Sequence, residues 1–188
     1  MGRWEPNARG RLEQAALALY GERGFEQVTV AEIAGRAGLT ERTFFRHYAD
    51  KREVLFAGSS TLQEFLVRAV TEAPDTSAPI DVVVAALEAV GALFEERRDL
   101  ARQRQAIIDA NPELQERELI KLATLATALA GALRERGISE PAASLTGQAG
   151  IAIFRVAFER WVNDTGQRDL PELIRESFDE LKSLTAGT

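Results

Sequence analysis

Apolar residues recur at intervals of three and four along nearly the whole chain, while the strict alternation typical of strands is almost absent. This spacing places apolar side chains on one face of an α-helix. The first predicted helix covers residues 9–23, with Leu12, Ala15 and Leu19 on one face and Gly24 positioned to end it. The pattern therefore predicts an all-α protein.

Two short helical patterns follow, one on either side of Gly38. Thr29 is placed to cap the first of them, and Glu32, three residues later, completes the pattern of a capping box. Thr40 is placed to cap the second, which ends near Tyr48, and glycine at position 38 permits a tight turn between the helices. This is the layout of a helix-turn-helix, whose second helix can enter the major groove of DNA.

The rest of the chain continues the helical pattern. We expect a fourth helix from Asp50 to about residue 73, followed by a connector, APDTSAP, with two prolines. Further helices are predicted over residues 80–95, 99–109, 113–136, 139–163 and 169–184. We place a domain boundary at residue 50, so that residues 1–50 form an N-terminal arm and a three-helix helix-turn-helix domain. Residues 51–188 then form a helical bundle for ligand binding and dimerisation.

Composition narrows the function classes. The chain has 188 residues without cysteine, and its one histidine is His47. It lacks an HExxH motif, a phosphate-binding loop and a Glu-x-x-His pair, so we predict no enzyme activity, no metal site and no cofactor. No apolar run approaches the ~20 residues needed to span a bilayer, and residues 1–10 lack the apolar core of a signal peptide. We therefore expect a cytoplasmic protein with no membrane partner.

Charge is unevenly distributed. The net charge of −6 argues against a protein that coats nucleic acid over its whole surface. Residues 1–55 nevertheless carry a net charge of +1, and the remaining residues carry −7. Because the acidic excess belongs to the C-terminal part, a local DNA-binding face at the N-terminus is compatible with the acidic balance of the whole chain.

The second helix of the motif carries two kinds of side chain. Phe44 and Tyr48 lie four residues apart and so share one face, which we expect to be buried. Arg42, Thr43 and Arg46 point away from it, where arginine can contact guanine and threonine can contact a thymine methyl group or a phosphate. The alternative is a helical subdomain that does not bind DNA, because such subdomains also bury two aromatic residues beneath exposed charges.

Polar residues also flank the motif. Thr29 and Lys51 lie at helix starts, where a hydroxyl or an ammonium group suits phosphate oxygens. His47 cannot build a metal site alone, so packing or a phosphate contact is its expected role. A flexible basic arm would be formed by Arg3, Arg9 and Arg11.

Residues 9–56 resemble the N-terminal domain of the TetR/AcrR family of transcriptional regulators. The matching run is A-x-x-L-Y-x-E-R-G-F-E-Q-V-T-V-A-E-I-A-x-R-A-G-L-T-x-R-T-F-F-R-H-Y-x-D-K-x-x-V-L. The resemblance implies that the third helix of the chain recognises DNA and that the following lysine holds a phosphate. Carried over position by position, it implies DNA contacts from Thr40, Glu41, Arg42, Thr43, Phe45, His47 and Lys51. Thr29 and Arg46 complete the predicted DNA-binding set.

Two positions depart from the family pattern. The family usually has tyrosine where this chain has Phe45, and a phenyl ring cannot donate a hydrogen bond to a phosphate. The family often has glycine or another small residue where this chain has Arg42. We predict that Arg42 contributes to sequence selectivity.

For the C-terminal part, the resemblance implies a ligand-binding domain and a homodimer whose interface is built from the last two helices. Each of these helices carries an apolar stripe, and two such helices per subunit could form a four-helix bundle between subunits. The predicted interface residues are Phe158, Trp161, Leu173, Phe178 and Leu181. The alternative is that both stripes pack inside one subunit.

The resemblance also implies a ligand pocket among the middle helices. Its candidate lining residues are Phe65, Leu87, Phe94, Arg104, Ile108, Leu122 and Phe154. Each apolar candidate could instead be plain core. Arg104, like Arg102, could hold a carboxylate or phosphate, or could pair with nearby carboxylates on a solvated face. Residues 104–137 loosely resemble a domain type associated with acyl-CoA-like ligands.

The leading hypothesis is a homodimeric, ligand-responsive transcriptional repressor that binds a palindromic double-stranded DNA operator. A small-molecule effector, apolar or acyl-type, would release the DNA by binding one of two conformational states more tightly. The alternatives are an activator with the same fold, which does not release DNA on ligand binding, and a helical interaction module.

Overall fold

The computed structural model describes residues 7–166 and 168–186, and all regular secondary structure within them is helical. The prediction of an all-α protein is confirmed. The chain divides into two compact units. Unit 1 consists of residues up to 58 together with 103–118, and unit 2 consists of residues 59–102 together with those from 119 onward. The boundary predicted at residue 50 differs from this division, because it falls inside unit 1.

Unit 1 contains the helix-turn-helix. Its helices are α1 (Ala8–Arg23), α2 (Val30–Arg36), α3 (Glu41–His47) and the 3₁₀ helix η1 (Glu53–Phe56). The boundary between the units passes through α6 (Arg98–Asp109) and α7 (Pro112–Glu135), so the end of α6 and the start of α7 also belong to unit 1.

The core of unit 1 is made by two segments far apart in the sequence. Leu12, Ile33 and Phe44 from the first three helices are fully buried. Ile108 and Leu114, from the segment 103–118, are fully buried in the same cluster. The three-helix motif therefore does not complete its own core, because part of its apolar surface is covered by residues that lie more than fifty positions further along the chain.

Short-range signals determine the helix ends in unit 1. The Thr29 hydroxyl oxygen accepts a hydrogen bond from Glu32 N (3.3 Å), and the Glu32 carboxylate accepts one from Thr29 N (2.9 Å), which is the predicted capping box. Gly24 and Gly38 have φ values of +82° and +66°. Residues with a side chain rarely adopt this left-handed conformation, so the two glycines allow the chain to turn after α1 and between α2 and α3.

The helix predicted from Asp50 to residue 73 is interrupted. Asp50 Oδ1 accepts hydrogen bonds from the backbone N–H groups of Arg52 (2.8 Å) and Glu53 (3.2 Å), immediately before and at the start of the short helix η1. Residues 54–56 are buried in the core of unit 1. The next helix, α4 (Ser59–Thr71), belongs to unit 2, so the break coincides with the boundary between the units.

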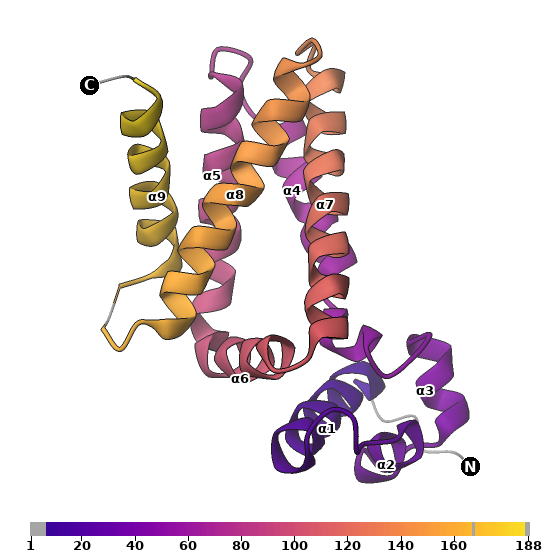
Figure 1. Cartoon of the computed structure of the whole chain (residues 1–188). Helices are drawn as coiled ribbons and strands as arrows, with labels where there is room; N and C mark the ends of the chain where they lie inside the picture. Colours follow the sequence, from indigo (N-terminus) through magenta and orange to yellow (C-terminus); the bar gives the residue numbers. More distant parts are fainter. Residues whose placement is uncertain (1–6, 167, 187–188) are drawn as a thin grey trace. The chain divides into compact units, whose positions relative to one another are not determined.

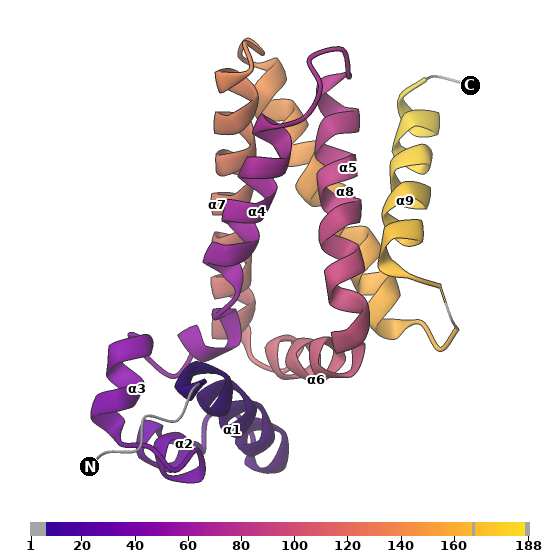
Figure 2. The ribbon, with the colours of Figure 1, turned by 180° about the vertical axis from the view of Figure 1, so that it is seen from behind.

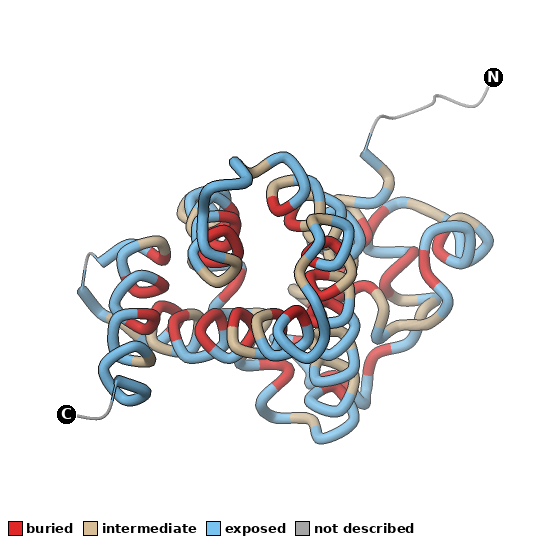
Figure 3. Tube along the Cα trace, turned by 90° about the horizontal axis from the view of Figure 1, so that it is seen from above, coloured by how far each residue is buried: buried red, intermediate tan, exposed pale blue. Residues whose placement is uncertain are grey.

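Unit 2 is a helical bundle. Besides α4 and the remaining parts of α6 and α7 it contains α5 (Pro79–Phe94), η2 (Glu95–Arg97), α8 (Ala142–Asn163) and α9 (Leu170–Thr185). Helix α8 packs against α5 and α9, and α5 also packs against α4 and α9 (Figure 1 and Figure 2). Buried and exposed residues alternate along these helices with the helical repeat (Figure 3). No helix in the described part of the chain is long and apolar enough to cross a membrane.

Two glycines let α8 approach its neighbours closely. A Cβ atom at Gly147 would lie 2.6 Å from Ala126 O on α7, and one at Gly150 would lie 2.4 Å from Cγ1 of Val83 on α5. Both distances are far shorter than a carbon atom can approach without repulsion. The packing of α8 on α5 and α7 therefore requires the absence of a side chain at these two positions.

Candidate nucleic-acid interface and effector domain

Helix α3 is anchored by its aromatic face, as its sequence predicts. Phe44 is fully buried, and Tyr48, directly after α3, is also buried, with the two ring centroids 5.5 Å apart. The Tyr48 hydroxyl donates a hydrogen bond to Glu13 Oε1 on α1 (3.0 Å). Burial, together with the nearby Glu13 carboxylate, raises the pKa of Tyr48. These contacts hold α3 on α1 and leave its opposite face outward.

The outward face of α3 carries Arg42, Phe45, Arg46 and His47, all exposed. Arg42 and Arg46 form no hydrogen bond or ion pair with any residue that the structure describes. Their guanidinium groups are therefore available for guanine edges or phosphates. The Phe45 ring is 55% exposed and meets Phe44 edge-on at 5.5 Å between centroids, which fixes it on the same outward face.

The first turn of α3 is organised by its own polar side chains. Thr40 Oγ1 accepts a hydrogen bond from Thr43 N (3.2 Å) and lies 3.1 Å from the Thr43 hydroxyl. Glu41 is exposed in the same turn, where a carboxylate can accept a hydrogen bond from a cytosine amino group. Thr40 thus caps α3 as predicted. Thr40 and Glu41 are exposed, and Thr43 is partly buried.

The two predicted phosphate contacts that flank the motif are engaged inside unit 1. The Thr29 hydroxyl donates to Glu32 Oε2 (2.9 Å), and Arg23 pairs with Glu32 Oε1 (2.6 Å). The hydrogen bond from the Thr29 backbone, followed by those from Arg23 and the Thr29 hydroxyl, lowers the pKa of Glu32 to about 2. Lys51 Nζ donates to three backbone carbonyls within residues 25–28. The polar groups of both side chains are thus bound by partners within unit 1.

The predicted basic arm is only partly within the described residues. Arg9 and Arg11 lie in α1, where they donate hydrogen bonds to the carbonyl oxygens of Ala57 and Ala37 respectively. They therefore tie α1 to η1 and α2. Arg3 lies outside the described residues.

Five of the seven residues predicted to line a ligand pocket belong to unit 2. They are Phe65, Leu87, Phe94, Leu122 and Phe154. Phe94 and Phe154 both contact Phe158, at 6.2 and 5.6 Å between ring centroids, and Phe158 contacts Trp161 at 5.6 Å. These four rings form a continuous aromatic cluster inside unit 2.

The other two predicted pocket residues, Arg104 and Ile108, belong to unit 1. Ile108 is fully buried in its core. Arg104 donates to Leu55 O (2.7 Å) and to Glu118 Oε1 (3.2 Å), and its guanidinium lies 5.0 Å from the ring centroid of Phe56. Burial lowers the pKa of Arg104. Both side chains thus make contacts within unit 1, whereas the other five candidates belong to unit 2.

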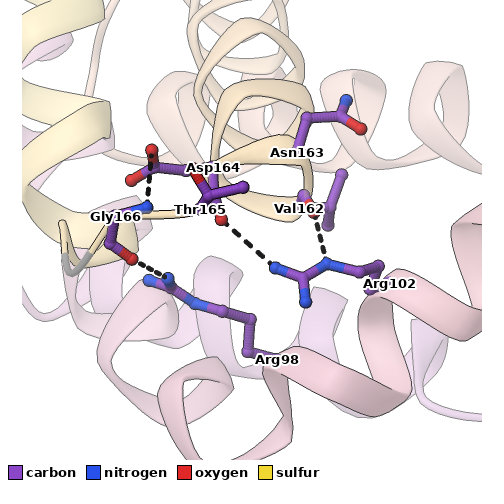
Figure 4. Close-up of a pocket in the computed structure, with 7 residues that line it drawn as sticks. All are labelled: Arg98, Arg102, Val162, Asn163, Asp164, Thr165 and Gly166. Carbon is purple, nitrogen blue, oxygen red and sulfur yellow. Dashed lines mark hydrogen bonds between the residues drawn. The ribbon is translucent and has the colours of Figure 1, made fainter.

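Two arginines of α6 line a pocket of about 660 Å³ at the C-terminal end of α8 (Figure 4). Arg102 donates to Val162 O (2.7 Å) and Asp164 O (3.2 Å), and Arg98 donates to Gly166 O (3.3 Å). The last carbonyls of a helix lack partners within the helix, and a cation there also interacts favourably with the helix dipole. Arg102 therefore binds the C-terminal end of α8, and Arg98 binds the segment that follows it.

Two models of known protein families match this chain. A model of bacterial regulatory proteins of the tetR family matches residues 13–57, which include α2 and α3. A model of the MftR C-terminal domain matches residues 77–186, more than half of the chain. The chain belongs to the TetR family. It is a helix-turn-helix, DNA-binding transcriptional regulator, and regulators of this family are typically repressors with ligand-binding C-terminal domains.

Similar proteins are regulators of the same family. The regulator TcmR of Streptomyces glaucescens is 35% identical over 82 residues, which cover 44% of this chain but only 36% of TcmR. A Mycobacterium tuberculosis protein assigned as the mycofactocin biosynthesis transcriptional regulator MftR is 27% identical over 184 residues, covering 95% of this chain and 91% of that protein. The TetR-family repressor FadR of Thermus thermophilus, whose crystal structure contains lauroyl-CoA, is 26% identical in sequence to this chain. The structural match covers 93% of both chains and has a TM-score of 0.58.

Most of the predicted interface residues lie inside a single TetR-family subunit. Trp161 and Leu173 are fully buried in the core of unit 2, and Phe178 is buried there as well. Phe158 and Leu181 are partly buried against the same core. In the single chain, both apolar stripes thus contribute to the core of unit 2.

A different apolar stripe of the TetR-family fold is exposed, and the prediction from the sequence missed it. On α8, Leu145, Ala152 and Val156 are exposed and Ala149 is partly exposed, and on α9 Leu184 is exposed. The four α8 residues follow one another at intervals of four, three and four, so the stripe was detectable as a helical pattern. The aromatic stripe on the same helix contains larger side chains, and only packing shows which of the two stripes faces the core.

Proposed function

We propose that this TetR-family regulator is a homodimeric repressor that binds a palindromic operator through α3 and releases it when an apolar or acyl-type effector binds unit 2. The observation that carries this proposal is the outward face of α3. Arg42 and Arg46 have no hydrogen-bond or ion-pair partner among the described residues, on a helix that Phe44 and Tyr48 fix in place. Unpaired guanidinium groups on a rigid helix suit bidentate contacts to guanine and contacts to phosphate.

Dimerisation is supported by the exposed apolar stripe on α8. Leu145 is 66% exposed and Val156 is 53% exposed, and a second copy packing against them would remove this surface from water. Arg155 and Glu159 are also exposed on α8 and have opposite charges, so two copies related by a twofold axis could pair them. A single helix-turn-helix makes few contacts, whereas two of them bind half-sites about 34–36 Å apart.

The effector proposal rests on the interior of unit 2 and on one relative. The rings of Phe94, Phe154, Phe158 and Trp161 form an apolar cluster, with the Arg98 guanidinium 5.0 Å from the Trp161 ring centroid. The related FadR structure contains lauroyl-CoA. We propose that an acyl or other apolar molecule contacts this cluster. To reverse a 99:1 preference for the DNA-binding state, it must bind the other state about 10⁴-fold more tightly.

Selection of bound duplexes from a random pool tests the proposal directly. We expect a palindrome with two half-sites, an affinity that falls steeply with salt, and release of the duplex by lauroyl-CoA. Absence of specific binding at low salt contradicts the DNA-binding proposal, and unchanged binding at saturating lauroyl-CoA contradicts the acyl-type effector.

The dimer has its own test. Val156→Glu places a charge in the exposed stripe of α8 and should produce folded monomers that no longer bind the palindrome tightly. Ala85→Glu adds the same charge at an exposed position of α5 and serves as the control. Sedimentation velocity decides, and a Val156→Glu protein that remains dimeric contradicts this interface.

A further inference from the structure

Lys51 lies at an unusual place for a group expected to hold DNA. Its ammonium donates hydrogen bonds to the carbonyl oxygens of Phe25 (2.9 Å), Glu26 (3.3 Å) and Val28 (3.1 Å). An ammonium group has three N–H donors and no acceptor, so these carbonyls use its whole hydrogen-bonding capacity. The same nitrogen lies 4.3 Å from the centroid of the Phe25 ring, a position in which the cation is attracted by the ring face.

The backbone of Lys51 is also fixed. The Tyr20 hydroxyl on α1 donates a hydrogen bond to Lys51 O (2.7 Å), and Tyr20 is itself buried beside Phe25, with their ring centroids 5.1 Å apart. Lys51 is therefore held at its backbone by α1 and at its ammonium by the segment after α1. Because both its backbone carbonyl and its ammonium group are bound, Lys51 is poorly placed to turn its side chain outward to a phosphate.

The carbonyls that Lys51 binds belong to the connection between α1 and α2. Residues 25–28 lie outside both helices, so the hydrogen bonds of an α-helix do not satisfy their backbone groups. The connection leads directly into Thr29, which caps α2. Helix α3 packs against α2, so an error in the position of the connection would be passed to the helix that faces DNA.

We infer that Lys51 is a positioning residue, which holds the α1–α2 connection in the conformation that α2 and α3 need for DNA binding, and that it is not a phosphate ligand. This differs from the role that the family resemblance implies for the lysine after the third helix. The inference rests on the proposed DNA binding for its functional consequence, and on the contacts of Lys51 alone for its structural part.

Salt dependence separates the two roles. Each phosphate contact that is lost makes the slope of log K against log salt concentration less steep by about 0.9. A positioning residue contributes no released counterion, so its loss lowers the affinity by the same factor at every salt concentration and leaves the slope unchanged.

Two variants of the full chain provide the test. Lys51→Met removes the charge, and Lys51→Arg keeps it but replaces three convergent donors by a planar fork, which does not fit three carbonyls around one point. We expect wild-type salt slopes and reduced operator affinity for both. Arg46→Met, which removes an exposed and unpaired guanidinium, is the matched control and should make the slope less steep.

Amide hydrogen exchange of the free protein gives a readout that needs no DNA. In both Lys51 variants the amides of residues 25–33 should exchange on the order of ten-fold faster or more, because the lost hydrogen bonds to a charged group no longer hold the connection in place. Exchange in α9 should not change. If Lys51→Met does not fold, Lys51→Arg decides alone.

The opposite results would overturn the inference. A phosphate ligand predicts a less steep slope for Lys51→Met, wild-type affinity for Lys51→Arg, and wild-type exchange of residues 25–33 in both. Failure of the wild-type protein to bind any duplex at low salt would contradict the proposed function instead, and the exchange comparison would still decide whether Lys51 holds the α1–α2 connection.

Discussion

Ile108 provides a quantitative test of how the two units are built. Its side chain has 0% exposure and lies in the core of unit 1, with residues of the helix-turn-helix. Ile108→Ala removes three buried carbon atoms, which corresponds to about 2.5 kcal/mol of lost transfer free energy. The cavity left behind raises the expected loss of stability to about 2–5 kcal/mol, a large part of the roughly 5–15 kcal/mol of a typical protein.

Urea unfolding followed by far-ultraviolet circular dichroism measures the free energy of unfolding. Ile120→Ala is the matched control, because Ile120 is 48% exposed and its truncation should change stability by no more than about 0.5 kcal/mol. We also expect Ile108→Ala to weaken operator binding, since the core beneath α2 and α3 is loosened. An Ile108→Ala protein with wild-type stability and an altered effector response would refute this reasoning. It would indicate that Ile108 lines a ligand pocket.

Three further predictions follow from individual contacts. Gly150→Ala should lower the free energy of unfolding by about 1–3 kcal/mol through overpacking, measured as a reduced thermal midpoint. The new Cβ atom meets Val83 Cγ1, so adding Val83→Ala should restore part of the loss. Glu32 has a pKa of about 2 in the folded protein against an ordinary 4.5, so its contribution to stability is complete above pH 4.5 and disappears as the pH falls toward 2. Across this range, the urea midpoint of Glu32→Gln should therefore depend less on pH than the urea midpoint of the wild-type protein. Equal pH dependence of the two proteins would exclude the capping box as a cause of the loss of stability at low pH. Arg42→Ala should cost about 1–3 kcal/mol on the selected operator and much less on a scrambled duplex, whereas equal losses on both would make Arg42 a phosphate contact.

Local features of the fold could be predicted because they depend on neighbours in the sequence. The capping box of Thr29 and Glu32 is formed by residues three positions apart, and the left-handed turn at Gly38 depends on one residue. The inward position of Phe44 and Tyr48 follows from their four-residue spacing on a short helix. For the same reason the exposed position of Arg42 and Arg46 could be anticipated.

The roles of several site residues depend on distant partners. Lys51 binds carbonyls 23 to 26 positions earlier in the chain, and Arg104 binds Leu55 O, 49 positions away. A sequence pattern shows only that these side chains are charged. Whether such a charge faces a phosphate or a carbonyl of its own chain is decided when the segments are brought together.

The sequence by itself determined the helical elements, their caps and the helix-turn-helix with its outward arginines, since these arise from interactions within about one helical turn. Only the tertiary structure decided that residues 103–118 complete the core of unit 1 and that Ile108 belongs there. It also decided which apolar stripe of α8 is buried, with Trp161 inside and Val156 outside. Both stripes satisfy the helical repeat equally well, and only the shape of the neighbouring helices, including the close approach at Gly147 and Gly150, selects between them.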